Sequence, residues 1–157
     1  MDDARITGIK AWAGLAGWVL LAFAASAAGA FFSPGDWYAS LNKPSFNPPG
    51  WVFGPVWTAL YAMMGVSAWL VWRRGNARRP LALWLLQLAL NAAWTPFFFG
   101  LHRMDIALVI IIAMWLAILA TLLAFRRHSR TAALLLVPYL LWVGFATVLN
   151  AALWRLN

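Results

Sequence analysis

The chain has 157 residues, of which 64% are hydrophobic and only 10% are charged. Soluble domains contain about 25% charged residues, so this chain has too few charges to cover the surface of a water-soluble fold. It also has no cysteine. The composition therefore excludes a soluble enzyme, a disordered tail and a disulfide scaffold, and we predict a single membrane domain.

Five apolar stretches are long enough to cross a bilayer core of about 30 Å, which takes roughly 20 helical residues. None of them contains Asp, Glu, Lys or Arg. Lipid cannot satisfy free backbone groups and the stretches are too long for barrel strands, so we expect helices. The sequence predicts an all-α membrane protein, a bundle of five transmembrane helices in one domain over residues 1–157. The predicted helices are about residues 11–32, 51–72, 81–99, 106–125 and 131–154.

The first stretch has some features of a cleavable signal sequence. Arg5 and Lys10 precede an apolar run that ends in small residues, as signal sequences do. The run is longer than the apolar core of a typical signal, however, so we expect it to remain as a membrane helix.

Basic residues are divided unequally between the two faces of the membrane. Nine of the 12 Lys and Arg precede the first stretch or lie in the second and fourth connections, and three lie on the other side. The positive-inside rule therefore places the N-terminus in the cytoplasm and the C-terminus outside. Because the basic runs are short and separated by apolar segments, we expect them to face lipid headgroups and predict no nucleic-acid partner.

The connection at residues 33–50 is longer than the other three. It holds four prolines together with Trp37, Tyr38 and Phe46. The prolines stiffen the chain and the aromatic rings can pack, so we predict a structured lid rather than an ordinary external loop.

Polar and aromatic side chains recur at four-residue steps within three of the predicted helices. This spacing places them on one helix face, and polar groups at bilayer depth turn inward and find partners. The three stripes are Trp57, Tyr61 and Gly65; Gln87, Asn91 and Thr95; and Trp142, Ala146 and Asn150. Together they predict a cavity for a flat, mostly apolar ligand. The alternative is that they only hold helices together, at about 0.6 kcal/mol per polar contact.

No conventional catalytic constellation is visible. The predicted helices carry no carboxylate, which disfavours proton-coupled transport, and there is no P-loop and no Ser–His–Asp set. His102 and His128 fall in short loops predicted on opposite faces, so they cannot share a metal ion. We therefore predict neither a metal site nor a cofactor.

Three segments resemble the hallmark motifs of the translocator protein family, also called TspO/MBR or peripheral benzodiazepine receptor. They occur in the order and spacing of that family, from about Trp37 to the C-terminus. The segments are residues 37–57, Gln87–Gly100, and Pro138–Asn150. The resemblance implies a five-helix bundle, usually a homodimer, with one ligand cavity per protomer under the first loop.

Members of this family bind porphyrins, haem-pathway intermediates and drugs of the isoquinoline or benzodiazepine type. We therefore interpret the chain as a tetrapyrrole-binding membrane protein that acts as a receptor, sensor or carrier. The resemblance carries the ligand-binding role to Tyr38, Pro48, Phe53, Trp57, Asn91, Trp94, Trp142, Ala146 and Asn150. A porphyrin would stack on the indoles, and its carboxylates could pair with Lys43 or Arg103.

Two alternatives to a binding role stay open. The family resemblance links Trp57 and Trp142 to light-dependent breakdown of porphyrins, which would make the protein an enzyme without a conventional active site. The other alternative is a structural or regulatory membrane protein with no ligand.

The last predicted helix departs from the pattern of animal members. They place a Tyr after Val-Leu-Asn, which completes a cholesterol-recognition pattern. Here Ala151 follows Val148–Asn150, and no Tyr lies within the five residues before Arg155. Such patterns are weak indicators even when complete, so we expect no specific cholesterol binding. With the high Ala and Arg content, this departure favours a bacterial member in the plasma membrane.

Overall fold

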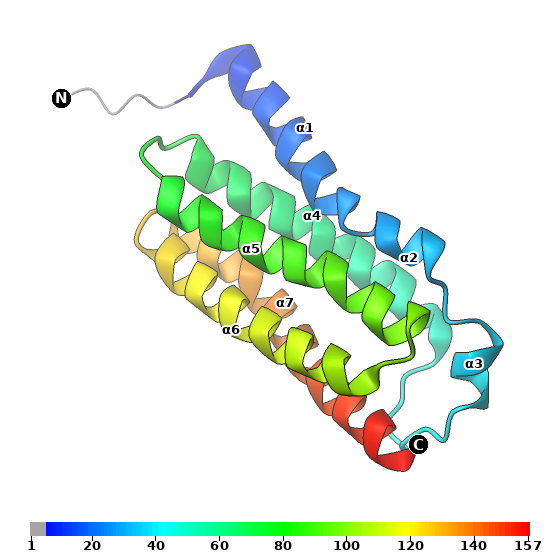
Figure 1. Cartoon of the computed structure of the whole chain (residues 1–157). Coiled ribbons are helices and arrows are strands. Elements are labelled where there is room, and N and C mark those ends of the chain that lie inside the picture. The colour runs from blue at the N-terminus through cyan, green and yellow to red at the C-terminus, as the bar shows by residue number, and fades with distance from the viewer. Residues whose placement is uncertain (1–5) are drawn as a thin grey trace.

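The structure is a computed structural model that describes residues 6–157 (Figure 1). Within them, five helical units are long and apolar enough to cross a membrane. They are Gly8–Phe31, Gly50–Trp72, Arg78–Gly100, Met104–Arg126 and Arg130–Leu156. The predicted all-α membrane fold is confirmed, with boundaries within three residues of the prediction. Arg5, which the orientation argument counts, lies outside the described residues.

The first unit is broken, although we expected one uninterrupted helix. It consists of α1 (Gly8–Ala24) and α2 (Ala27–Phe31). At the break, the amide of Ser26 donates to the carbonyl of Phe23 at 2.9 Å and its hydroxyl donates to the same oxygen at 2.6 Å. A serine side chain that competes for backbone groups in this way weakens a helix from within.

The remaining units follow in chain order. A short turn, η1 (Gly50–Val52), leads into α4 (Phe53–Trp72). Helix α5 (Arg78–Thr95) continues into a π-helical segment, η2 (Pro96–Gly100), because Pro96 cannot donate in the regular ladder. Helices α6 (Met104–Arg126) and α7 (Arg130–Leu156) complete the bundle.

The bundle has a definite order that leaves α1 at its edge. Helix α4 packs against α1 and α7, α6 packs against α7 and α5, and α2 touches α5 (Figure 1). The approach of α1 to α4 depends on Gly65, because a Cβ built there would lie 2.5 Å from the Cα of Val19. The order matters for function, since α2, α4, α5, α6 and α7 surround a common interior.

Polar contacts between helices support this packing, because the hydrophobic effect does not drive helices together in lipid. The hydroxyl of Ser67 on α4 donates to the carbonyl of Ala132 on α7 at 2.9 Å. The indole of Trp69 donates to the carbonyl of Ala11 on α1 at 2.7 Å. The interior around these contacts is filled with large side chains such as Trp84, which is fully buried.

Candidate ligand-binding cavity

A cavity of about 520 Å³ lies inside the bundle, beneath the connection between α2 and α4. Its volume falls within the range of about 300–1,000 Å³ that is usual for small-molecule sites. The aromatic residues that line it are Phe32, Tyr38, Phe53, Trp57, Tyr61, Trp94, Phe98, Phe99 and Trp142. Polar groups come from Ser26, Asn91, Thr95 and Asn150, and none of the lining residues is charged. This lining suits a flat ligand whose buried part is uncharged.

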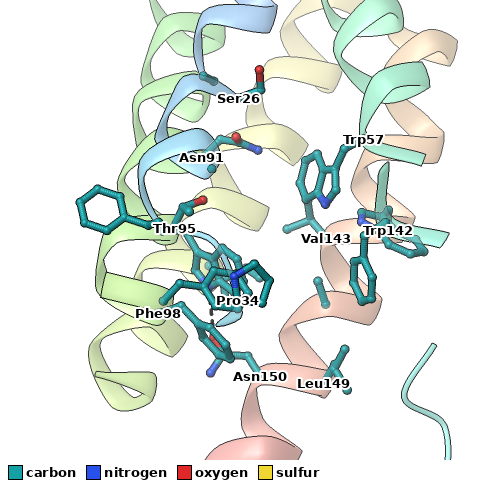
Figure 2. Close-up of a pocket in the computed structure, with 18 of the residues that line it drawn as sticks. Ser26, Pro34, Trp57, Asn91, Thr95, Phe98, Trp142, Val143, Leu149 and Asn150 are labelled. Atoms are coloured by element: carbon teal, nitrogen blue, oxygen red, sulfur yellow. Dashed lines mark hydrogen bonds between the residues drawn. The ribbon is translucent and has the colours of Figure 1, made fainter. Parts of the chain in front are cut away.

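Eight of the nine residues assigned from the sequence line this one cavity. They are Tyr38, Phe53, Trp57, Asn91, Trp94, Trp142, Ala146 and Asn150. Figure 2 shows Trp57 and Trp142 on one side, across from Asn91 and Thr95. Pro48 is the exception and does not line the cavity, because the loop turns Pro34 and Tyr38 inward instead.

Several lining residues were not predicted. Phe98 stands four residues after Trp94, so the helical step that identified the other stripes also points to it. Its ring stacks on that of Trp94 with centroids 4.7 Å apart. Ser26 lines the cavity at the break between α1 and α2, and Met114 comes from α6. No periodic signal in the sequence identifies these last two residues.

Three tryptophans on three different helices form the walls. Trp57 on α4 stacks on Tyr61, with centroids 5.4 Å apart and an interplanar angle of 29°. Trp142 on α7 meets the ring of Phe53 edge-on at 5.9 Å. Trp94 on α5 donates its indole N–H to Asn150 Oδ1 at 3.0 Å. Since each indole is fixed by a neighbour on the same or another helix, the aromatic walls are formed before any ligand binds.

The indole N–H of Trp142 is buried and has no hydrogen-bond partner among residues 6–157. A buried donor without a partner is costly, and buried indoles usually find one. Although Trp142 lines the cavity, its Nε1 atom is itself buried, so the indole faces the cavity with its other ring atoms rather than with its N–H.

A buried chain of hydrogen bonds lies beside the cavity and joins α4, α5 and α7. The hydroxyl of Tyr61 donates to Asn91 Oδ1 at 2.8 Å, and Asn91 Nδ2 donates to the hydroxyl of Tyr139 at 3.0 Å. That hydroxyl in turn donates to Gln87 Oε1 at 2.8 Å. The polar stripe of α5 therefore serves both purposes considered from the sequence. Asn91 lines the cavity, while Gln87 only holds helices together.

The loop above the cavity contains helix α3 (Gly35–Ser40) and is held at several points. The ring of Trp37 stacks on His102 in the α5–α6 connection, with centroids 4.0 Å apart and planes within 9°. Asn42 N donates to Asn157 Oδ1 at 2.9 Å, and Asn157 Nδ2 returns a bond to Asn42 O at 3.0 Å. We call residues 33–49 the lid, since they cover the cavity and contact the α5–α6 connection and the residue that follows α7.

Tyr38 is the polar lid side chain that lines the cavity. Its hydroxyl donates to Asn47 Oδ1 at 3.0 Å, within the lid itself. Burial raises the pKa of Tyr38 above its ordinary value of 10, and the hydrogen bond with Asn47 partly opposes that rise. The phenol is therefore neutral at physiological pH and adds no charge to the cavity.

The sequence pattern of the TspO/MBR family matches residues 18–155. The chain belongs to this family. It is 46% identical to the tryptophan-rich sensory protein of Cereibacter sphaeroides over 129 residues. The matched region covers 82% of this chain and 82% of the relative. Protein CrtK of Rhodobacter capsulatus is 44% identical over 137 residues, 85% of this chain and 86% of the relative. The translocator protein of Homo sapiens is 48% identical over 126 residues, 77% of this chain and 75% of the human protein.

The two cations assigned to ligand carboxylates are already bonded within this TspO/MBR protein. Lys43 Nζ donates to the carbonyls of Ala39 and Leu41 at 3.0 and 3.2 Å. Arg103 makes a two-point contact with Asp105, at 2.8 and 2.6 Å. Neither cation lines the cavity, so the structure does not support the predicted pairing with a porphyrin carboxylate.

Trp37→Ala is expected to loosen the lid without unfolding the bundle. The variant loses the stack on His102 and edge contacts with Phe98 and Phe99, at centroid distances of 5.8 and 6.5 Å. Aromatic pairs contribute about 0.5–1.5 kcal/mol each, so amide hydrogen exchange over residues 36–48 should accelerate by about tenfold or more. Trp154→Phe, at the exposed end of α7, is the control and should leave the exchange of the lid unchanged. Equal exchange in Trp37→Ala and wild type would show that this residue does not hold the lid.

Proposed function

We propose that this TspO/MBR protein binds a porphyrin or another haem-pathway tetrapyrrole and acts as its membrane receptor, sensor or carrier. The observation that carries the proposal is an uncharged cavity walled by Trp57, Trp94 and Trp142 on three helices. A macrocycle has two broad apolar faces that can stack on indoles. The name of the Cereibacter sphaeroides relative, tryptophan-rich sensory protein, supports a sensor role.

The charge distribution limits how such a ligand would bind. Because no lining residue is charged, ionised carboxylates would be strongly disfavoured inside the cavity. In the proposed pose the macrocycle lies between the indoles, and its carboxylates point past the lid towards water. Neutral isoquinoline or benzodiazepine-type compounds suit the same uncharged, aromatic cavity.

Porphyrin titration monitored by tryptophan emission tests this function. Wild-type protein should be quenched at low micromolar porphyrin or below. Trp57→Phe and Trp142→Phe should each weaken binding by about 3- to 10-fold, the equivalent of one lost aromatic contact. Trp154→Phe removes an indole outside the cavity and should leave affinity unchanged. If both cavity variants keep wild-type affinity and quenching, the cavity is not the porphyrin site.

Light-dependent porphyrin degradation is the second candidate function. The observation that favours it is that Trp57 and Trp142, the two residues of the family resemblance, both line the cavity. In this proposal, photoexcited porphyrin is oxidised with oxygen as the oxidant. Turnover should require light and oxygen and should vanish in Trp57→Phe while binding survives. Equal decay in empty micelles would remove the proposal.

The placement in the membrane is also a proposal. Of the 11 described Lys and Arg, eight lie at the end of the bundle where α1 begins and three at the other. This asymmetry supports a cytoplasmic N-terminus and an external C-terminus, in a bacterial plasma membrane. The family resemblance further supports a homodimer, and the absence of the complete sterol pattern supports no specific cholesterol binding.

A further inference from the structure

One end of the bundle carries eight Lys and Arg and, within residues 6–157, no Asp or Glu. These cations lie at residues 6–10, 73–79 and 126–130, and we call this surface the basic end. The two acidic residues that the structure describes, Asp36 and Asp105, belong to the opposite end, where Asp105 pairs with Arg103. The described part of the basic end therefore has no internal counter-charge.

The three segments form one surface rather than three separate runs. Arg74 Nη1 donates to the carbonyl of His128 at 2.5 Å, which joins the α4–α5 connection to the α6–α7 connection. Ile6 N donates to the carbonyl of Arg73 at 3.0 Å, which brings the start of α1 to the same place. Figure 1 shows both connections at the end of the bundle from which α1 begins. Positive charge from distant parts of the sequence is thus concentrated in one region.

Three of these arginines occupy positions that helix stability does not explain. Arg78 and Arg79 occupy the first turn of α5, and Arg130 is the first residue of α7. Positive charge at a helix N-terminus opposes the helix dipole. All three side chains are exposed and have no carboxylate partner among the described residues. Their energetic cost to the isolated chain would be relieved by an external anion.

The neighbouring side chains indicate that this anion carries a hydrocarbon tail. The guanidinium of Arg73 lies over the ring of Trp69, 4.7 Å from its centroid. Trp69 stacks on Trp12 at 6.3 Å, and Trp12 is 67% exposed while Ile9 is 89% exposed. Indoles occupy the headgroup level of a bilayer. Because Ile9 and Trp12 belong to the membrane-spanning unit Gly8–Phe31, an anion bound beside them lies at the lipid interface.

We propose that the basic end is a binding surface for anionic phospholipids. Guanidinium groups of residues 73–79 and 126–130 bind the phosphodiester oxygens, for which their planar donor pairs are well suited. The acyl chains lie along Trp12 and Ile9. This proposal does not depend on the ligand of the cavity, because the basic end and the lid are at opposite ends of the bundle.

Energy transfer from tryptophan to a dansyl-labelled lipid tests the proposal on the full chain in neutral detergent micelles. Labelled phosphatidylglycerol should bind at least tenfold more tightly than labelled phosphatidylcholine. Each surface arginine contributes roughly fivefold to such attraction. Arg78→Gln/Arg79→Gln and Arg126→Gln/Arg127→Gln should therefore each reduce the preference by about tenfold or more. Arg103→Gln/Arg155→Gln removes the same charge at the opposite end and should leave the preference intact.

Three results would overturn the proposal. They are a full preference in both basic-end variants, an equal loss in the opposite-end control, and complete competition by inorganic phosphate at the concentration of the lipid. Added salt provides a test that needs no variant, since screening should weaken the preference of the wild-type protein. A preference that is insensitive to salt would contradict the proposal even if a variant failed to fold.

Discussion

Ala146→Phe is expected to reduce porphyrin affinity by at least about 100-fold, which corresponds to a loss of about 2.7 kcal/mol. Ala146 lies on α7, four residues from both Trp142 and Asn150, and all three residues line the cavity. A phenyl ring at this position would occupy the space next to the indole that the macrocycle needs. Porphyrin quenching of tryptophan emission would measure the loss.

The same substitution on the lipid-facing surface separates occlusion of the cavity from a general effect of added bulk. Ala59 on α4 is exposed and does not line the cavity, so Ala59→Phe should bind porphyrin like wild type. Because the phenyl of Ala146→Phe enters space that is already empty, overpacking should be small and the thermal midpoint should change little. Retention of near-wild-type affinity by Ala146→Phe would place the porphyrin elsewhere.

The sequence was sufficient to predict the spans and part of the cavity wall. The spans and the helix-face stripes depend on local patterns, whereas Tyr38, Phe53 and Trp94 were assigned from the family resemblance. Charge-free apolar stretches of about 20 residues define membrane helices whatever surrounds them. A four-residue step fixes which side chains share a helix face. It does not determine which helix lies opposite that face. Gln87 and Asn91 share a face, yet Gln87 meets Tyr139 in the packed interior while Asn91 also reaches the cavity.

Features that depend on long-range contacts were not predictable in this way. The break between α1 and α2 was also missed, although it is local: the Ser26 hydroxyl bonds to Phe23 three residues earlier, and many helical serines do so without a break. The prolines identify the lid as stiff. Which proline faces the cavity depends on the position of α3. Its position follows from contacts with His102 and Asn157, which are far from it in the sequence. For the same reason Pro34, and not Pro48, lines the cavity.

Tyr139→Phe is expected to cause a large loss of stability for the removal of one oxygen atom. The hydroxyl of Tyr139 is fully buried, accepts from Asn91, donates to Gln87 and lies 3.6 Å from the sulfur of Met114. Its removal leaves Asn91 Nδ2 and Gln87 Oε1 without these bonds, although Asn91 Oδ1 keeps its bond from Tyr61. A buried polar group without a partner costs about 1–3 kcal/mol in a packed interior. Polar contacts between membrane helices average only about 0.6 kcal/mol, so we expect a total near 2 kcal/mol.

Tyr61→Phe is the matched comparison, because it removes the same atom from the other end of the hydrogen-bond chain. The hydroxyl of Tyr61 makes one bond, to Asn91 Oδ1, and Tyr61 borders the cavity. Water or ligand can therefore replace it, and we expect a loss of about 0.6 kcal/mol. Thermal unfolding in the same detergent should show midpoints lowered by about 4–8 °C for Tyr139→Phe and by about 1–2 °C for Tyr61→Phe. Equal shifts would mean that Tyr139 is not the centre of the network, and that helices α5 and α7 are held together mainly by apolar packing.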